Sequence, residues 1–144
     1  KGPLKTSPQR SRAMSAVRGA GNHTTEKRLR AGLIQAGIQG WNVNPAGVLG
    51  KPDFWFPRTR VAVFVDGCFW HGCAKCGHLP KSNSGFWALK IGRTKSRDKR
   101  NSKVLRRMGV QVIRIWEHEL TTGVTAVVTR LALVLSSRRT TLSA

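Results

Sequence analysis

The first hydrophobic pattern along the chain predicts a helix. Its apolar residues fall on one side of a helical turn, and they are Leu29, Leu33 and Ile34. Thr24 or Thr25 can cap this helix, which we expect to run to about Gln35.

Continuous apolar runs further along predict strands. Residues 53–56, which begin with Asp53, contain one such run, and residues 61–66, which end with Asp66, follow after a short turn. In 61–66 apolar side chains occupy both faces, which is typical of a central strand covered on both sides. Residues 110–116 predict a second buried strand, and a short one is expected near Trp41.

A long helix is predicted over about residues 85–108 and ends at Gly109. Its inward stripe recurs at steps of three and four, and consists of Trp87, Ile91, Thr94, Asp98, Asn101, Leu105 and Met108. Burying a charge is unfavourable, so a carboxylate on the inward face, such as Asp98, needs either a partner for its charge or a functional role. The plainer alternative is a buried ion pair with a neighbouring arginine.

The last part of the chain predicts another amphipathic helix. Its apolar positions are Val124, Val127, Val128, Leu131 and Leu135. Helix, strands, helix, strand and helix in this order predict an α/β sandwich, with a mixed sheet between helices on both faces. We expect residues 13–144 to form a single domain.

Charge then narrows the choice of partner. Lys and Arg number 26 and Asp and Glu only 6, for a net charge of +20, which favours binding to a polyanion such as DNA. We expect residues 1–12 to form a flexible basic arm and residues 12–19 a short helix. No basic amphipathic anchor, apolar span or export signal is seen, so we expect no membrane partner and a cytoplasmic protein.

Carboxylates are so scarce that each one is a candidate for function. The six are Glu26, Asp53, Asp66, Asp98, Glu117 and Glu119. Salt bridges to the many cations suffice for Glu119, but they explain Asp53 and Asp66 less well because apolar residues surround both. A Pro-Asp pair before an apolar strand is the layout of many nucleases in which the aspartate holds Mg²⁺. Such nucleases usually add Asp/Glu-x-Lys on the next strand, where this chain has Val63-Phe64-Val65.

The cysteines predict a metal site. All three lie within nine residues, as Cys68, Cys73 and Cys76. An odd number of cysteines argues against a disulfide framework, and the spacing suits a tetrahedral zinc ion. The fourth ligand stays open among three histidines, His118, His78 and His71, and three free thiols without metal are the alternative.

One segment carries a specific family resemblance. Asp-Gly-Cys-Phe-Trp-His-Gly-Cys at residues 66–73, preceded by Gly-Lys-Pro-Asp-Phe at 50–54, resembles the very-short-patch repair (Vsr) endonucleases. Phe86-Trp87, Arg97-Asp98 and Trp116-Glu117 extend a resemblance that covers roughly residues 10–120. It implies a restriction-endonuclease-like three-layer sandwich with a structural zinc site.

The resemblance also implies roles for individual residues. Asp53 and the backbone carbonyl of Val65 match the ligands of a catalytic Mg²⁺, of which the family uses two. His71 matches the general base, and Glu26 and Asp98 complete the family's acidic set. The family's zinc positions correspond to Cys68, Cys73, Cys76 and His118, which favours His118 as the fourth ligand and assigns His71 to catalysis.

Other positions match the family's contacts with DNA. Phe69, Trp70 and Trp87 match an aromatic wedge that enters DNA beside a mismatch, although Trp87 could equally belong to the core. Lys90 and Thr94 match residues that contact the mismatched pair. Met14 and Val17 match residues of an N-terminal helix that reaches the other groove.

The implied reaction is hydrolysis of one phosphodiester on the 5′ side of the T in a T·G mismatch. Such a nick would begin repair of deaminated 5-methylcytosine by a monomer acting on double-stranded DNA at the bacterial nucleoid. Two rival hypotheses are a Vsr-like homing or restriction endonuclease and a DNA-binding module without catalysis.

Overall fold

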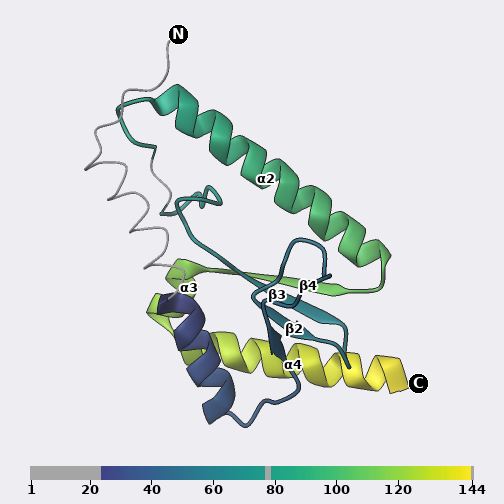
Figure 1. Ribbon diagram of the computed structural model, residues 1–144. Helices are drawn as coiled ribbons and strands as arrows, with labels where there is room; N and C mark the ends of the chain where they lie inside the picture. The colour runs from purple at the N-terminus through teal and green to yellow at the C-terminus, as the bar shows by residue number, and fades with distance from the viewer. Residues whose placement is uncertain (1–23, 77–78, 144) are drawn as a thin grey trace.

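A computed structural model describes residues 24–76 and 79–143 of the 144-residue chain (Figure 1). Several predictions lie outside the described residues, namely the arm at 1–12, the helix at 12–19, Met14, Val17 and His78. No helix in the described ranges is long and apolar enough to cross a membrane.

The centre of the molecule is a mixed four-stranded sheet in the order β1-β2-β3-β4. The strands are β1 (Asn42–Val43), β2 (Phe54–Phe56), β3 (Val61–Asp66) and β4 (Gln111–Trp116). β2 runs antiparallel to β1 and β3, whereas β3 and β4 are parallel. All six residues of β3 are buried, which confirms the predicted central strand.

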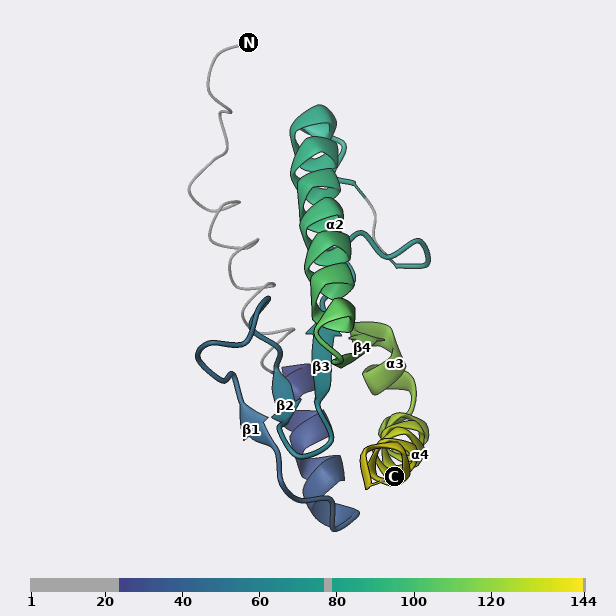
Figure 2. The same ribbon diagram turned by 90° about the vertical axis from the view of Figure 1, so that its right-hand side faces the viewer.

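Helices cover both faces of this sheet, as the two views show (Figures 1 and 2). On one face a helix at residues 24–35, α3 (Glu117–Thr122) and α4 (Val124–Ser143) pack against alternate residues of β3. On the other face Ala62 and Phe64 pack towards Leu105 of α2 (Ser84–Arg107). The α/β class and the mixed sheet with flanking helices are therefore confirmed.

Some predicted details were wrong. Ile34 is 61% exposed and Met108 is 58% exposed, so neither belongs to an inward stripe. α2 ends at Arg107, and Met108 is its C-cap residue, beyond the part that faces the sheet. Asp53 precedes β2 instead of lying in it, and its N–H donates to the carbonyl of Val63 at 2.9 Å.

Candidate active site and metal centre

The parallel pair β3 and β4 ends at one edge of the sheet, and a cleft of 440 Å³ opens there. Residues from β3, β4, α2 and two loops line it, among them Lys51, Asp53, Val65, Asp66, His71, Arg97, Asp98, Asn101 and Arg114. Four of the site residues predicted from the sequence, Asp53, Val65, His71 and Asp98, thus share one cleft. A fifth, Glu26, reaches it through Asp53.

Asp53 lines the cleft, and a backbone N–H holds its carboxylate in place. The N–H of Val65 donates to Asp53 Oδ2 at 2.6 Å. Burial raises the pKa of Asp53 from its ordinary 3.8 to about 7, and the adjacent Glu26 carboxyl adds to this rise. Two half-buried carboxyls side by side form a set of hard oxygen donors, which suits a divalent cation.

His71 and Asp98 form a close pair. His71 Nδ1 lies 2.6 Å from Asp98 Oδ2, a short hydrogen bond between the loop after β3 and the inward face of α2. Gly72 follows His71 and lies close to α2: its φ is +67°, and a Cβ there would lie 2.7 Å from Cγ2 of Ile91. The predicted inward position of Asp98 is therefore confirmed, and it has a partner.

Sequence reasoning missed Arg114, and it left the role of Asp66 undecided. Asp66 Oδ1 lies 3.6 Å from His71 Nδ1 and 3.6 Å from Arg114 Nη1. Burial raises the pKa of Asp66, and the charges of His71 and Arg114 oppose that rise. The signal that could have identified Arg114 was its charge inside the otherwise apolar run Ile113-Arg114-Ile115.

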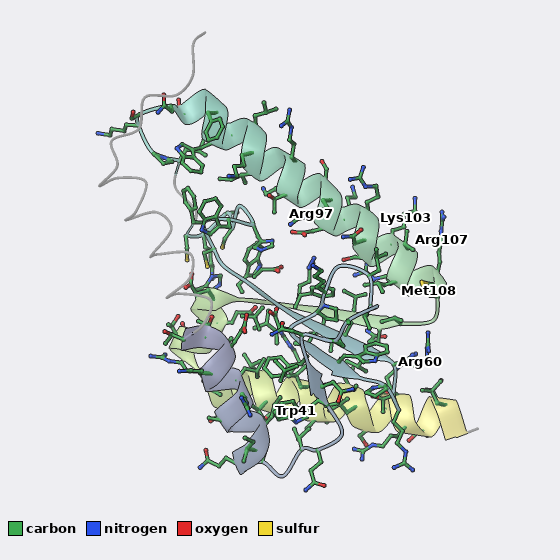
Figure 3. All side chains as sticks on the ribbon, in the orientation of Figure 1. Trp41, Arg60, Arg97, Lys103, Arg107 and Met108 are labelled. Atoms are coloured by element: carbon green, nitrogen blue, oxygen red, sulfur yellow. The ribbon has the colours of Figure 1, made fainter. Side chains whose placement is uncertain are left out.

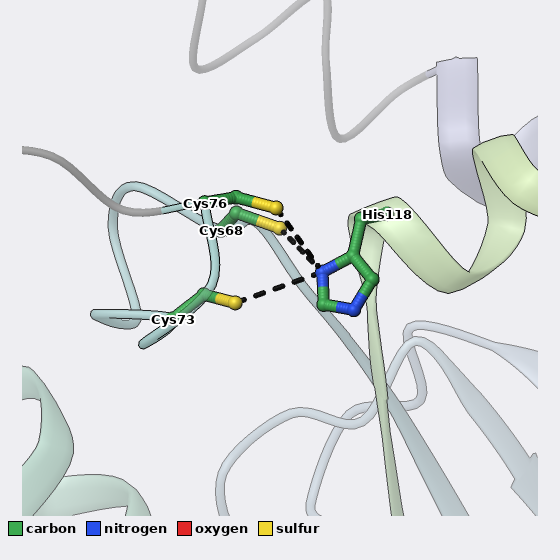
Figure 4. A group of neighbouring side chains, drawn as sticks. All are labelled: Cys68, Cys73, Cys76 and His118. Atoms are coloured by element: carbon green, nitrogen blue, oxygen red, sulfur yellow. Dashed lines mark hydrogen bonds between the residues drawn. The ribbon is translucent and has the colours of Figure 1, made fainter.

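Three cysteines and His118 form a compact cluster (Figure 4). The Sγ atoms of Cys68, Cys73 and Cys76 lie 3.4, 3.6 and 3.5 Å from His118 Nδ1, and all four candidate ligand atoms lie within 4.8 Å of one another. Tetrahedral zinc with ordinary Zn–S and Zn–N bonds separates such atoms by about 3.5 Å. The cluster could therefore bind a structural metal ion such as zinc.

The parallel register explains how a distant histidine reaches the cysteine loop. Asp66 pairs with Trp116, so the residues two positions beyond each, Cys68 and His118, emerge side by side. The N–H of Cys68 also lies 3.4 Å from Glu117 Oε1. Burial raises the pKa of the Cys68 thiol to about 12, so a bound cation would be needed to keep it as thiolate near neutral pH.

Aromatic side chains gather between the cysteine loop and the start of α2. Ring centroids are 5.0 Å apart for Phe69 and Trp70, 5.5 Å for Phe69 and Trp87, and 5.6 Å for Trp70 and Trp87. Phe86, which the sequence analysis did not assign, extends the cluster and is 41% exposed. The Lys90 amine lies 5.3 Å from the Trp70 ring. Trp87 is thus half-buried within this aromatic group rather than in the central core.

α2 carries Thr94, the remaining predicted DNA contact in the described residues, and much of the positive charge. Thr94 is half-buried one turn after Lys90 and donates its hydroxyl to the carbonyl of Lys90 at 3.2 Å. Arg97, Lys103 and Arg107 lie along the same helix and are exposed (Figure 3).

Comparisons with known proteins agree with one another. The model of the family described as DNA mismatch endonuclease Vsr matches residues 4–77. The type II nicking enzyme V.NaeI of Lentzea aerocolonigenes is 39% identical over 132 residues, which are 88% of this chain and 78% of that protein. The type II nicking enzyme V.XorIIP of Xanthomonas oryzae pv. oryzae is 35% identical over 81% of this chain and 85% of its own length. The DNA mismatch endonuclease Vsr of Escherichia coli K12 is 34% identical, covering 75% of this chain and 69% of that protein.

These similarities identify a DNA endonuclease. More narrowly, the chain belongs to the Vsr family of DNA-repair nucleases, which confirms the resemblance noted from residues 50–73.

Proposed function

We propose that the protein is a Mg²⁺-dependent endonuclease that nicks the T strand on the 5′ side of a T·G mismatch. The observation that carries this proposal is the meeting of Asp53, His71 and Asp98 in one cleft, with Glu26 against Asp53. The three-layer arrangement supports a restriction-endonuclease-like fold for the nuclease.

Asp53 and Glu26 are the residues that fit the catalytic cation, with the Val65 carbonyl as a further oxygen ligand. A divalent cation would neutralise the negative charge of these paired, half-buried carboxyls. When bound, Mg²⁺ stabilises negative charge on the phosphate and lowers the pKa of its bound water.

His71 is the general base in this proposal. Nδ1–H donates to Asp98 Oδ2, which leaves the Nε2 lone pair to take a proton from the attacking water. The water oxygen bonds to phosphorus and the bond to the 3′ oxygen breaks. The departing 3′ oxygen takes a proton from solvent, which leaves a 3′-hydroxyl and a 5′-phosphate.

The aromatic cluster supports recognition of a weakened base step. Phe69, Trp70 and Trp87 offer flat, partly exposed surfaces beside the cleft, and a mismatch lowers the free energy needed to unstack a step. Lys90 above these rings provides a cation for the DNA backbone, with Thr94 one turn away. The names of the type II nicking enzymes among the relatives favour cleavage of one strand over two.

Duplexes that differ only in a central T·G or C·G pair test the proposal. With Mg²⁺ and randomised flanking bases, we expect one nick 5′ to the mispaired T, at least about tenfold faster than any cut in the C·G duplex. Cleavage of both strands of the C·G duplex would point to a restriction or homing enzyme. Gel-shifted DNA without cleavage would point to a binding module.

Replacing Trp70 with alanine tests the wedge separately. Loss of one stacking ring is expected to raise the Kd for T·G duplex about tenfold, because base–aromatic stacking contributes roughly 1–3 kcal/mol. Affinity for matched duplex should change much less. Leu133→Ala is the control, since Leu133 is 69% exposed on α4 across the sheet. Equal weakening for both duplexes would show that Trp70 contributes nothing to recognition of the mismatch.

A further inference from the structure

Arg114 occupies a position where the strand pattern calls for an apolar residue. It pairs with Phe64 across the parallel strands and shares its face of the sheet with Val112, which is buried under α2. The guanidinium carbon lies 4.3 Å from the Phe64 ring centroid, and the side chain is only 24% exposed. A charged group so placed destabilises the fold unless partners compensate for its lost hydration.

The partners of Arg114 are the two carboxylates nearest His71. Nη2 lies 3.4 Å from Asp98 Oδ1, and Nη1 lies 3.6 Å from Asp66 Oδ1. Nη1 is buried and has no hydrogen-bond partner within residues 24–76 and 79–143. The guanidinium therefore lies between two acids at ion-pair separations, with the Phe64 ring beside it.

Asp98 divides its two oxygens between different neighbours. Oδ2 accepts from His71 Nδ1 at 2.6 Å, while Oδ1 faces Arg114. A carboxylate with one oxygen held by a fixed cation cannot rotate freely about its Cβ–Cγ bond. Asp66 Oδ1, at 3.6 Å from the same Nδ1, is a competing acceptor that Arg114 also holds.

We propose that Arg114 is a positioning residue that orients Asp98, so that Asp98 keeps His71 in the tautomer with hydrogen on Nδ1. Nε2 then carries no hydrogen, and its lone pair can accept the proton of the attacking water. This inference rests on the proposed nuclease function. Lysine cannot replace the planar fork that reaches both acids, because its ammonium is a single point charge.

Arg97 is a matched control. Its Nη2 lies 3.6 Å from the same Asp98 Oδ1, but its side chain is 58% exposed against 24% for Arg114. Solvent screens such a pair, so Arg97 should contribute little to the orientation of Asp98.

Nicking kinetics give the first test. Arg114→Met is expected to lower kcat about 10- to 100-fold, as loss of a group that orients a catalytic ligand does elsewhere. KM for DNA should stay within about threefold, because Arg114 acts through Asp98 rather than on substrate. Arg114→Lys keeps a cation near Asp98 but not the planar fork that reaches both acids, so it should recover only a small part of the loss. An unchanged kcat in Arg114→Met overturns the proposal.

A double-mutant cycle with Asp66→Asn tests the main alternative, in which Arg114 only compensates the charge of Asp66. If Arg114 orients Asp98, Arg114→Met lowers kcat by a similar factor with and without Asp66→Asn. If Arg114 only compensates the Asp66 charge, its effect vanishes in the Asp66→Asn background, and the proposal is wrong. The neutral partner also limits the unfolding that an uncompensated buried Asp66 could cause.

Nitrogen-15 NMR of the histidines, without DNA, reads the tautomer directly. Wild type and Arg97→Met should show hydrogen on Nδ1 of His71, whereas Arg114→Met should shift population towards Nε2–H. An identical His71 spectrum in Arg114→Met contradicts the inference. This measurement does not depend on nicking: a wild-type protein that fails to nick refutes the proposed function, while the spectra still decide the role of Arg114.

Discussion

Replacing Asp53 with asparagine is expected to lower the nicking rate on the order of 10³-fold, the loss that follows removal of one charge-stabilising group from a hydrolase. Asparagine keeps an oxygen for the N–H of Val65 but loses the negative charge beside Glu26. Single-turnover nicking of the T·G duplex at saturating enzyme measures the effect. Wild-type rates in this variant would exclude Asp53 from the catalytic cation site.

Thermal unfolding without metal separates this loss from misfolding. The pKa of Asp53 is about 7 in the folded chain against an ordinary 3.8, so its contribution to stability is complete below about pH 4 and lost as the pH rises to 7. Above pH 7 wild type holds a half-buried charge that Asp53→Asn lacks. The variant should therefore melt higher at pH 8, by about 4 °C for each kcal/mol, and the difference should shrink towards pH 4. A lower Tm at pH 8 would attribute lost activity to damage of the fold.

Much of the cleft could be predicted because strand and helix periods report the direction of side chains. The three- and four-residue steps of α2 placed Asp98 on its inward face, where it meets His71. The unbroken apolar run of β3 predicted a central strand, and its last residue, Asp66, ends in the cleft.

Pairing between strands could not be predicted in the same way. Period two puts Arg114 and Val112 on one face of β4, but no pattern in the sequence states that Arg114 lies opposite Phe64. The same register carries His118 to Cys68, so the choice among three histidines depended on a tertiary contact. α3 was missed because its six residues follow β4 directly, without a polar spacer.

The four residues between Cys68 and Cys73 connect the cysteine–histidine cluster to the cleft. Cys68 and Cys73 flank Phe69, Trp70 and His71, and the N–H of Cys73 donates to the carbonyl of Cys68 at 2.8 Å. A metal ion that holds both cysteines would fix the two ends of this loop. It would thereby fix the aromatic wedge and the proposed base together.

Loss of the metal is therefore expected to impair both recognition and chemistry. Cys73→Ser should lose the zinc that elemental analysis is expected to find at about one ion per chain. Its Tm should fall by roughly 10 °C or more, since structural zinc contributes on the order of 10 kcal/mol in small zinc domains. Nicking should become undetectable and selectivity for T·G binding should disappear, whereas Asp53→Asn should keep that selectivity.

Two histidine variants decide which fourth ligand completes the cluster. His118→Ala should behave like Cys73→Ser, because His118 Nδ1 lies within 3.6 Å of all three thiols. His78→Ala should keep its zinc and serves as the control for mutating a histidine that follows Cys76 by two positions in the sequence. Zinc retained in His118→Ala and lost in His78→Ala would reverse the ligand assignment. Zinc retained in both variants, with an unchanged Tm in Cys73→Ser, would show that a metal ion at this cluster does not hold the loop.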